Sequence, residues 1–343
     1  AIGVMKTTDG GTTWNESGNI SASSMNDIYI DPNNSAILWL ATSNGVYKST
    51  NSGANWTLKL PGNIRDLKMK PGNTSTWYAA SSNKVYRSID SGETFNEVSI
   101  TGFSNSTRIV IDVTPANPNY VYFVSAGNVT VDGEVKSNYF NGIYKSINSG
   151  ASYFKTSETK DIFKSTQAWY DLALTVSDTQ ANTVYVGVLD IWKSTDGGNN
   201  FTQMNNWSSP NSDSYTHADI HFMRFIDGKF FAGTDGGIYV STNHGTKFTD
   251  LTENLAISQF YKISVAAQNS GNIVGGLQDN GGYAYKDNKW NNYFGADGMD
   301  CAINTLNPNN YFGFIQYGGS LYETTDGGLT RKNSVGAPSA ETG

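Results

Sequence analysis

The sequence predicts an all-β protein, a β-propeller assembled from four-stranded blades. Three observations support this fold class: a turn motif that returns along the chain, short segments in which apolar and polar residues alternate, and a composition poor in helix formers. The chain has 343 residues, of which 36 are glycine and only 15% are charged. Long amphipathic helices need Glu, Lys and Arg on their exposed faces. Short strands joined by turns are therefore the better interpretation.

The recurring motif reads Ser/Thr-x-Asp/Asn-x-Gly-x-x-aromatic. Its copies are centred on Asp9, Asn51, Asp90, Asn148, Asp196, Asn243 and Asp326. Most steps between copies are about 40 to 60 residues, which is the length of a four-stranded blade. The last copy ends in Arg331 where an aromatic residue is expected, and residues 285–290 look like a shortened version.

The chemistry of this motif is that of a hairpin turn. An Asp or Asn side chain accepts hydrogen bonds from the backbone N–H groups that follow it, and Gly adopts the positive φ that other residues resist. The aromatic residue returns on the next strand and packs against the blade. A period-2 strand pattern precedes the copies, as in residues 45–48 and 142–145. We therefore expect a structural turn between the third and fourth strands of each blade.

This placement fixes the rest of the predicted topology. First strands are expected to begin near Asp27, Asp66, Arg108, Asp171, Asp219, Tyr261 and Asp300. The result is seven complete blades within residues 18–335, preceded by a half-blade hairpin in residues 1–17 and followed by a linker, 336–343, to a further C-terminal region. Two interpretations of the hairpin remain. In the first, strands beyond Gly343 complete the hairpin into an eighth blade. In the second, the hairpin belongs to a neighbouring propeller, and the ring has seven blades.

The topology also separates two faces. The Pro/Asn turns between first and second strands share one face with the repeated motif. The loops that enter first strands and the loops that join second to third strands lie on the other face, with the insertion 127–141. Ligand pockets of propellers are expected at such loop-built mouths, and sugar rings stack on exposed aromatic side chains. The candidate ligand-binding residues of this loop-rich face are Trp169, Tyr170, His217, Gln278 and Tyr317.

Carboxylates of the same face are candidates for catalysis, because glycosidases use two carboxyl groups about 5 to 10 Å apart. We nominate Asp235, Asp279 and Asp297. Asp27, Asp66, Asp171, Asp219 and Asp300 share one repeat position, and are better explained as caps at the starts of strands.

His217, Asp219 and His221 would project to one side of a strand. A hydrogen-bonded triplet is the favoured interpretation of these residues, and a divalent metal site is a guess. No cofactor is expected.

Charge and composition exclude several partners. The net charge of −7 and the pI near 5.0 disfavour nucleic acid, and no apolar stretch approaches the roughly 20 residues that span a bilayer. Cys301 is the single cysteine, so an internal disulfide is excluded. The expected partner is a glycan or a protein that binds the loop-rich face.

The repeated motif resembles the Asp-box (BNR) repeats of sialidases, sortilin/Vps10-like receptors, xyloglucan-degrading glycoside hydrolases and a photosystem assembly factor. The resemblance covers nearly the whole chain and implies that the motifs are structural. Residues 232–239 are similar to the Thr-Asp-x-Gly-Gly-x-Tyr stretch that carries a catalytic Asp in xyloglucanases, although one residue is absent after Asp235. Sialidases need an arginine triad, and no convincing Arg-Ile-Pro motif is present.

The expected function is that of a binding module in a larger exported or cell-surface protein, such as a cargo of type IX secretion. A glycoside hydrolase that uses paired Asp residues is the alternative. An assembly factor for a membrane complex is a weaker one.

Overall fold

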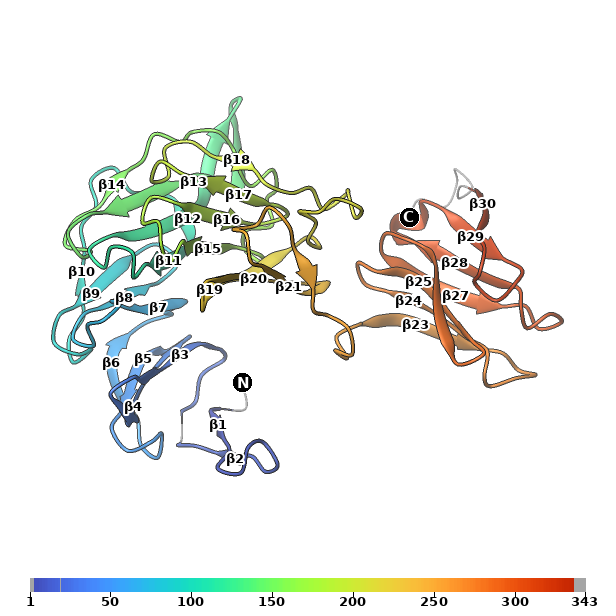
Figure 1. The fold of residues 1–343 in the computed structure, drawn as a ribbon, viewed down its shortest axis with the longest axis horizontal. Helices are drawn as coiled ribbons and strands as arrows, with labels where there is room; N and C mark the ends of the chain where they lie inside the picture. The colour runs from blue at the N-terminus through green and yellow to red at the C-terminus, as the bar shows by residue number, and fades with distance from the viewer. Residues whose placement is uncertain (1–2, 19, 336–343) are drawn as a thin grey trace. The chain divides into compact units, whose positions relative to one another are not determined.

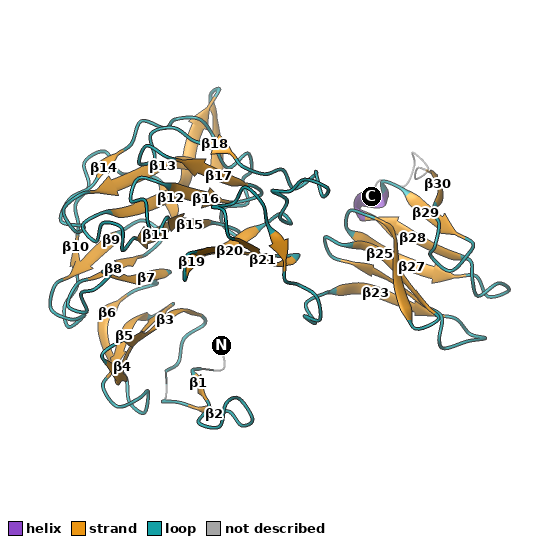
Figure 2. Ribbon diagram, in the orientation of Figure 1, coloured by secondary structure: helices purple, strands orange, loops and turns teal. Residues whose placement is uncertain are grey.

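The computed structural model describes residues 3–18 and 20–335, and its secondary structure is almost entirely β (Figure 2). Seven four-stranded antiparallel sheets and one two-stranded sheet are present in these residues. Each four-stranded sheet takes its strands in chain order, from the innermost to the outermost. This is the up-and-down blade of a β-propeller, as predicted. Within the described residues, no helix has the length and apolarity needed to cross a membrane.

The chain divides into two compact units (Figure 1). The larger unit comprises residues 1–234 and 238–251. Its strands are β1 (Met5–Lys6), β2 (Asn15–Glu16), β3 (Met25–Asp31), β4 (Asn34–Thr42), β5 (Gly45–Ser49), β6 (Thr57–Pro61), β7 (Asp66–Met69), β8 (Trp77–Ala80), β9 (Val85–Ser88), β10 (Asn96–Glu97), β11 (Ser106–Val113), β12 (Val121–Val131), β13 (Glu134–Ser146), β14 (Phe154–Lys155), β15 (Ala173–Val176), β16 (Val184–Gly187), β17 (Ile191–Ser194), β18 (Thr202–Gln203), β19 (Ile220–Ile226), β20 (Lys229–Thr234), β21 (Gly237–Ser241) and β22 (Thr249–Asp250).

The smaller unit comprises residues 235–237 and 252–343. Its two blades are formed by β23 (Phe260–Val265), β24 (Ile273–Leu277), β25 (Gly281–Lys286), β26 (Lys289–Phe294), β27 (Gly298–Ile303), β28 (Tyr311–Ile315), β29 (Leu321–Thr324) and β30 (Lys332–Val335), with a short 3₁₀ helix at Gln316–Gly318.

The observed first strands begin within two residues of the seven predicted starts. At the N-terminus, β1 pairs with β2 as the expected hairpin. Whether this hairpin completes a blade stays a prediction, and the linker predicted at 336–343 lies outside the described residues.

The insertion 127–141 is a β-hairpin. Strands β12 and β13 continue through it as a long hairpin, which pairs Val129 with Lys136 and Val131 with Glu134. Its tip is a two-residue Asp132-Gly133 turn with positive φ at both positions. An Asp-Gly pair between alternating β-branched residues is a strong hairpin signal, so the sequence contained the information needed to predict it.

All seven copies of the motif form the same turn, which we call the repeat turn. In the copy centred on Asp196, Ser194 Oγ donates to Asp196 Oδ1 (2.8 Å), the Gly198 amide donates to Ser194 Oγ (2.9 Å), and the Asn200 amide donates to Asp196 Oδ1 (3.0 Å). The other six copies repeat these three bonds. The motif therefore closes a hairpin and is structural in every copy.

Repeat turns share one end of the blade with the turns between first and second strands, as predicted. The Ser91 amide donates to the Ser75 carbonyl (2.9 Å), and the Gly197 amide donates to the Asn182 carbonyl (2.8 Å), so the two kinds of turn are bonded to each other. A Cβ on Gly92 would lie 2.5 Å from Nε1 of Trp39 in the neighbouring blade. Glycine at this position therefore permits close packing between blades as well as positive φ.

The shortened copy at residues 285–290 is a different turn. Lys286 pairs with Lys289 across a two-residue loop in which Asp287 and Asn288 both have positive φ. This is the tight hairpin that such residues favour. Tyr285 and Trp290 leave it side by side, with ring centroids 5.1 Å apart.

Candidate ligand-binding site

Two exposed aromatic side chains stand next to each other on the loop that precedes β15. Trp169 is 61% exposed and Tyr170 is 40% exposed, and their ring centroids are 5.6 Å apart. The Tyr170 ring also meets the His221 ring of β19 edge-on at 4.7 Å. We call Trp169 and Tyr170 the aromatic platform. Both residues were predicted as ligand contacts.

The loop that carries the aromatic platform is fixed by an arginine of the neighbouring blade. Arg108 of β11 donates from Nη1 to the Ala168 carbonyl (3.1 Å) and from Nη2 to the Leu172 carbonyl (3.4 Å). These two carbonyls flank the platform in the sequence. Because one rigid guanidinium binds both of them, the platform loop is held in place from the adjacent blade.

A pair of carboxyl groups provides a second connection to this loop. Asp171 is fully buried, and its side chain is within hydrogen-bonding reach of Asp219. Ionised carboxylates only accept hydrogen bonds, so one of the two must carry a proton for this bond to form. Burial, followed by the hydrogen bond to Asp219 and its charge, raises the pKa of Asp171 to about 8. Asp171 therefore retains its proton near neutral pH.

Asp219 also accepts a hydrogen bond from the platform loop. Its Oδ1 accepts a hydrogen bond from Gln167 Nε2 (3.3 Å), which brings the start of the platform loop to the same carboxyl pair. Its φ is +61°, a conformation that Asp tolerates better than most residues.

Beside the platform loop, a cavity of about 850 Å³ opens along the inner strands β3, β7, β11, β15 and β19. The charged and titratable residues of its lining are Asp27, Arg65, Asp66, Lys68, Arg108, Asp112, Asp178, His221 and Arg224. Arg108 and His221 thus belong to the cavity and also contact the platform loop.

Most carboxylates of the cavity are engaged by the protein. Lys68 Nζ donates to Asp66 and, at 3.2 Å, to Asp27, while Asp66 Oδ2 accepts the Ile111 amide at 2.6 Å. Burial acts to lower the pKa of Lys68, but the charge of Asp66 and other anionic neighbours outweigh it and raise that pKa well above its usual value. Lys68 is therefore a permanent cation in this triad.

Asp112 is held by the next blade. Its Oδ2 accepts the Val176 amide (2.8 Å) and the Thr175 hydroxyl (3.1 Å). Burial nevertheless raises the pKa of Asp112 to about 6, so this carboxyl group titrates near neutral pH.

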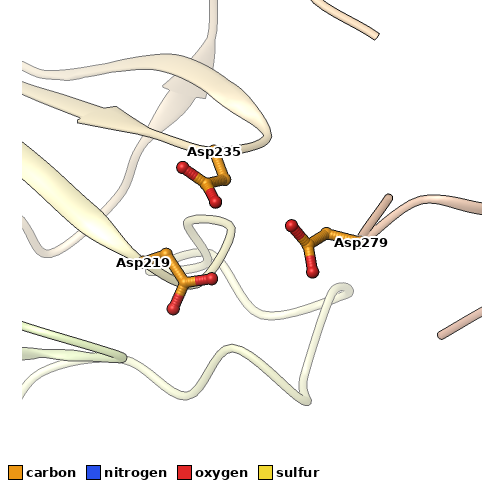
Figure 3. A group of neighbouring side chains, drawn as sticks. All are labelled: Asp219, Asp235 and Asp279. Carbon is orange, nitrogen blue, oxygen red and sulfur yellow. The ribbon is translucent and has the colours of Figure 1, made fainter. Parts of the chain in front are cut away.

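The three carboxylates nominated for catalysis occupy turns and strand starts. Asp235 lies in the turn between β20 and β21, and Asp279 lies in the turn between β24 and β25 (Figure 3). Asp297 immediately precedes β27, and its Oδ1 accepts the Asp279 amide at 2.7 Å, so it stabilises that turn. A catalytic role for these residues stays a prediction.

The remaining predicted ligand contacts are distributed over both units. Gln278 of the smaller unit immediately follows β24, and its backbone amide donates to the Gln259 carbonyl (3.0 Å). Tyr317 lies in the 3₁₀ helix and is 95% exposed, with a positive φ. His217 belongs to the larger unit, where its Nδ1 lies 3.2 Å from the Ala218 carbonyl oxygen.

Two sequence-based arguments about this region were wrong. Strand β19 begins at Ile220, so His217 and Asp219 do not lie on a strand, and the alternation that placed them on one side with His221 does not apply. The prediction that the strand-start carboxylates share one repeat position is also wrong. Asp66 pairs with Ala80 inside its sheet, whereas Asp171 and Asp219 lie before β15 and β19.

The sequence analysis did not identify the contact between Asp171 and Asp219 or the role of Arg108. These residues come from three different blades, and no local pattern connects them. The one available signal was that Asp171 directly follows the predicted aromatic pair.

No protein-family model matches this chain, and no curated protein matches it. Among solved structures, the GH74 enzyme of Niastella koreensis is 18% identical, covers 99% of this chain over 55% of its own length, and has a TM-score of 0.62. An ancestral GH74 enzyme is 17% identical with a TM-score of 0.51, covering 89% of this chain and 44% of its own.

PorZ, a bacterial surface component of the type-IX secretion system of Porphyromonas gingivalis, has a TM-score of 0.52 at 13% identity. It covers 92% of this chain and 40% of its own. This chain therefore spans about half the length of these proteins, or less. At such identities the likeness establishes the fold, and that fold is a β-propeller.

Proposed function

We propose that this chain is the glycan-binding propeller of an exported or cell-surface protein, and that the aromatic platform is its contact surface. The observation that carries the proposal is the side-by-side exposure of Trp169 and Tyr170 on a loop clamped by Arg108. Sugars offer apolar C–H faces that pack on aromatic rings, and indole and phenol groups combine an apolar face with a polar edge. A loop already fixed in its binding conformation loses little entropy when a ligand arrives.

The setting of the site supports the same proposal. The seven repeat turns fit an Asp-box propeller, a class that includes exported carbohydrate-active proteins. Structures of similar fold include GH74 enzymes and the surface protein PorZ. We accordingly propose that residues 18–335 are one region of a longer exported chain, with its ligand on the loop-rich face.

The test is a titration with a panel of soluble oligosaccharides, followed by calorimetry. Trp169→Ala and Tyr170→Ala should each weaken binding about tenfold or more, as expected for exposed aromatic anchors. Trp14→Ala is the matched control, because Trp14 is 57% exposed but belongs to a repeat turn. Failure of every oligosaccharide to bind, or an equal loss in the Trp14 variant, would contradict the proposal.

A further inference from the structure

Two arginine side chains of the cavity are not engaged by the protein. Arg65, directly before β7, and Arg224, within β19, form no side-chain hydrogen bond or ion pair with any residue of the described ranges, yet both line the cavity. Both are exposed to solvent. They are therefore free to bind a ligand without breaking an existing contact.

Neighbouring carboxylates do not serve as their partners. Asp27 and Asp66 bind Lys68, and Asp112 accepts hydrogen bonds from the blade of β15. Among the described residues, three carboxylates of the cavity are thus engaged by the protein, whereas the guanidinium groups of Arg65 and Arg224 are not.

Arg65 also lies close enough to Arg108 for their charges to interact. The pKa of Arg108 is lowered to about 10, mainly by burial and next by the positive charge of Arg65. Two like charges held together in a partly enclosed space repel each other, and an anion bound between them would relieve that repulsion. Guanidinium groups bind carboxylate and sulfate oxygens through paired, charge-assisted hydrogen bonds.

Two residues connect the cavity to the aromatic platform. Arg108 contributes to the cavity lining while it binds the carbonyls that flank the platform. His221 lines the same cavity and packs against Tyr170. The platform residue Tyr170 therefore contacts a residue of the cavity that Arg65 and Arg224 also line.

We propose that the ligand is an anionic glycan, whose sugar ring stacks on Trp169 and Tyr170 and whose carboxylate or sulfate group enters the cavity toward Arg65 and Arg224. This inference rests on the proposed glycan-binding function and specifies its ligand class. The arginines supply the charge selectivity, and the platform supplies contact that is common to neutral and charged sugars.

The experiment compares three oligosaccharides of equal length: a neutral glucan, a galacturonate oligomer and a sulfated glucan. Calorimetry on the whole chain should show that one or both anionic oligomers bind at least about tenfold more tightly than the neutral one. Addition of salt should weaken only the anionic interaction. A preference for galacturonate over the sulfated oligomer assigns the carboxylate, and the reverse assigns the sulfate.

Arg65→Gln and Arg224→Gln should each remove most of the preference for anionic sugars and leave the affinity for the neutral oligomer unchanged. Neither side chain has a structural partner, so both variants are expected to fold. Arg331→Gln is the control, an exposed arginine of the smaller unit that packs over Tyr322. Equal binding of all three oligomers, with loss of all binding in Trp169→Ala, would overturn this inference but retain the platform. Absence of binding by all three would overturn both.

Discussion

Aspartate side chains have opposite properties in the repeat turns and in the platform loop. In the repeat turns, hydrogen bonds from Thr330 and the following backbone lower the pKa of Asp326 to about 2. Burial acts to raise the pKa of Asp196, but hydrogen bonds from Asn200 and Ser194 outweigh it and lower that pKa to about 2 as well. In the platform loop, burial and Asp219 raise the pKa of Asp171 to about 8.

This difference shows how the surroundings determine the role of one residue type. A carboxylate that accepts several N–H and O–H bonds at an exposed turn is a permanent anion that closes a hairpin. A buried carboxyl group next to another carboxyl group retains its proton and links two blades. The charge of the Asp side chains in the repeat turns therefore does not change over the neutral pH range, whereas the charge of Asp171 in the platform loop does.

The largest effect is expected at the charged triad of Asp27, Asp66 and Lys68 in the cavity lining. Asp66→Ala leaves Lys68 with Asp27 alone and removes the acceptor of the Ile111 amide. Breaking a buried ion pair typically costs about 3 to 5 kcal/mol, and we expect a loss of about 4 kcal/mol in the free energy of unfolding. Urea denaturation measures this. A loss below about 1 kcal/mol would show that the triad is dispensable.

The pH dependence of the Asp171 variant is expected to be the next largest effect. Because the folded pKa of Asp171 is raised, its stabilising contribution is complete below the unfolded pKa near 4 and is lost as pH rises toward 8. One retained proton corresponds to about 1.4 kcal/mol per pH unit. Asp171→Asn mimics the protonated form, so the stability difference between it and the native chain should change by about 3 kcal/mol from pH 5 to pH 7.

Parallel pH profiles of the native chain and Asp171→Asn would contradict the retained proton. Asp161→Asn provides a control at a half-buried Asp on the same loop-rich side, whose pKa is raised by burial and not by a neighbouring carboxyl group.

A repeat turn should show a smaller effect with the opposite dependence on pH. Asp196→Ala removes the acceptor for the Ser194, Asn199 and Asn200 donors and should cost about 1 kcal/mol at pH 7. Because the folded pKa of Asp196 is lowered, this contribution is present above pH 4 and is lost as pH falls toward 2. The difference between the two chains should therefore shrink in acid, and thermal melts at pH 7 and pH 3 measure it.

The smallest effect is expected for Asp196→Asn. Three repeat turns already have Asn at this position, namely Asn51, Asn148 and Asn243, and each forms the same amide-to-side-chain bond. We expect a change within about 0.5 kcal/mol in the unfolding free energy at pH 7. A cost as large as that of the Ala variant would mean that charge, and not hydrogen-bond geometry, closes the turn.

The sequence predicted the blades and the repeat turns because both follow from local patterns. The seven first strands begin within two residues of their predicted starts, and every copy of the motif forms its turn. The exposed platform at Trp169 and Tyr170 was also predicted, from the position of these residues before a first strand. In each case neighbours in the sequence determine the outcome.

The site beneath the platform was not predictable in the same way. Arg108 and Leu172 are 64 positions apart, and their contact depends on how one blade packs against the next. The proton that Asp171 retains depends on burial and on the neighbouring Asp219, which the sequence does not show. Because every Asp at a strand start was treated as equivalent, the close pair of Asp171 and Asp219 was not predicted.

Hydrogen exchange with and without a bound oligosaccharide tests most directly whether the platform side of the larger unit is the binding side. Binding should slow exchange in residues 167–172 and at the start of β19, and should leave the amides of the repeat turns at Gly92 and Gly198 unchanged. Protection confined to the repeat turns, with none in the platform loop, would contradict the assignment of the two faces.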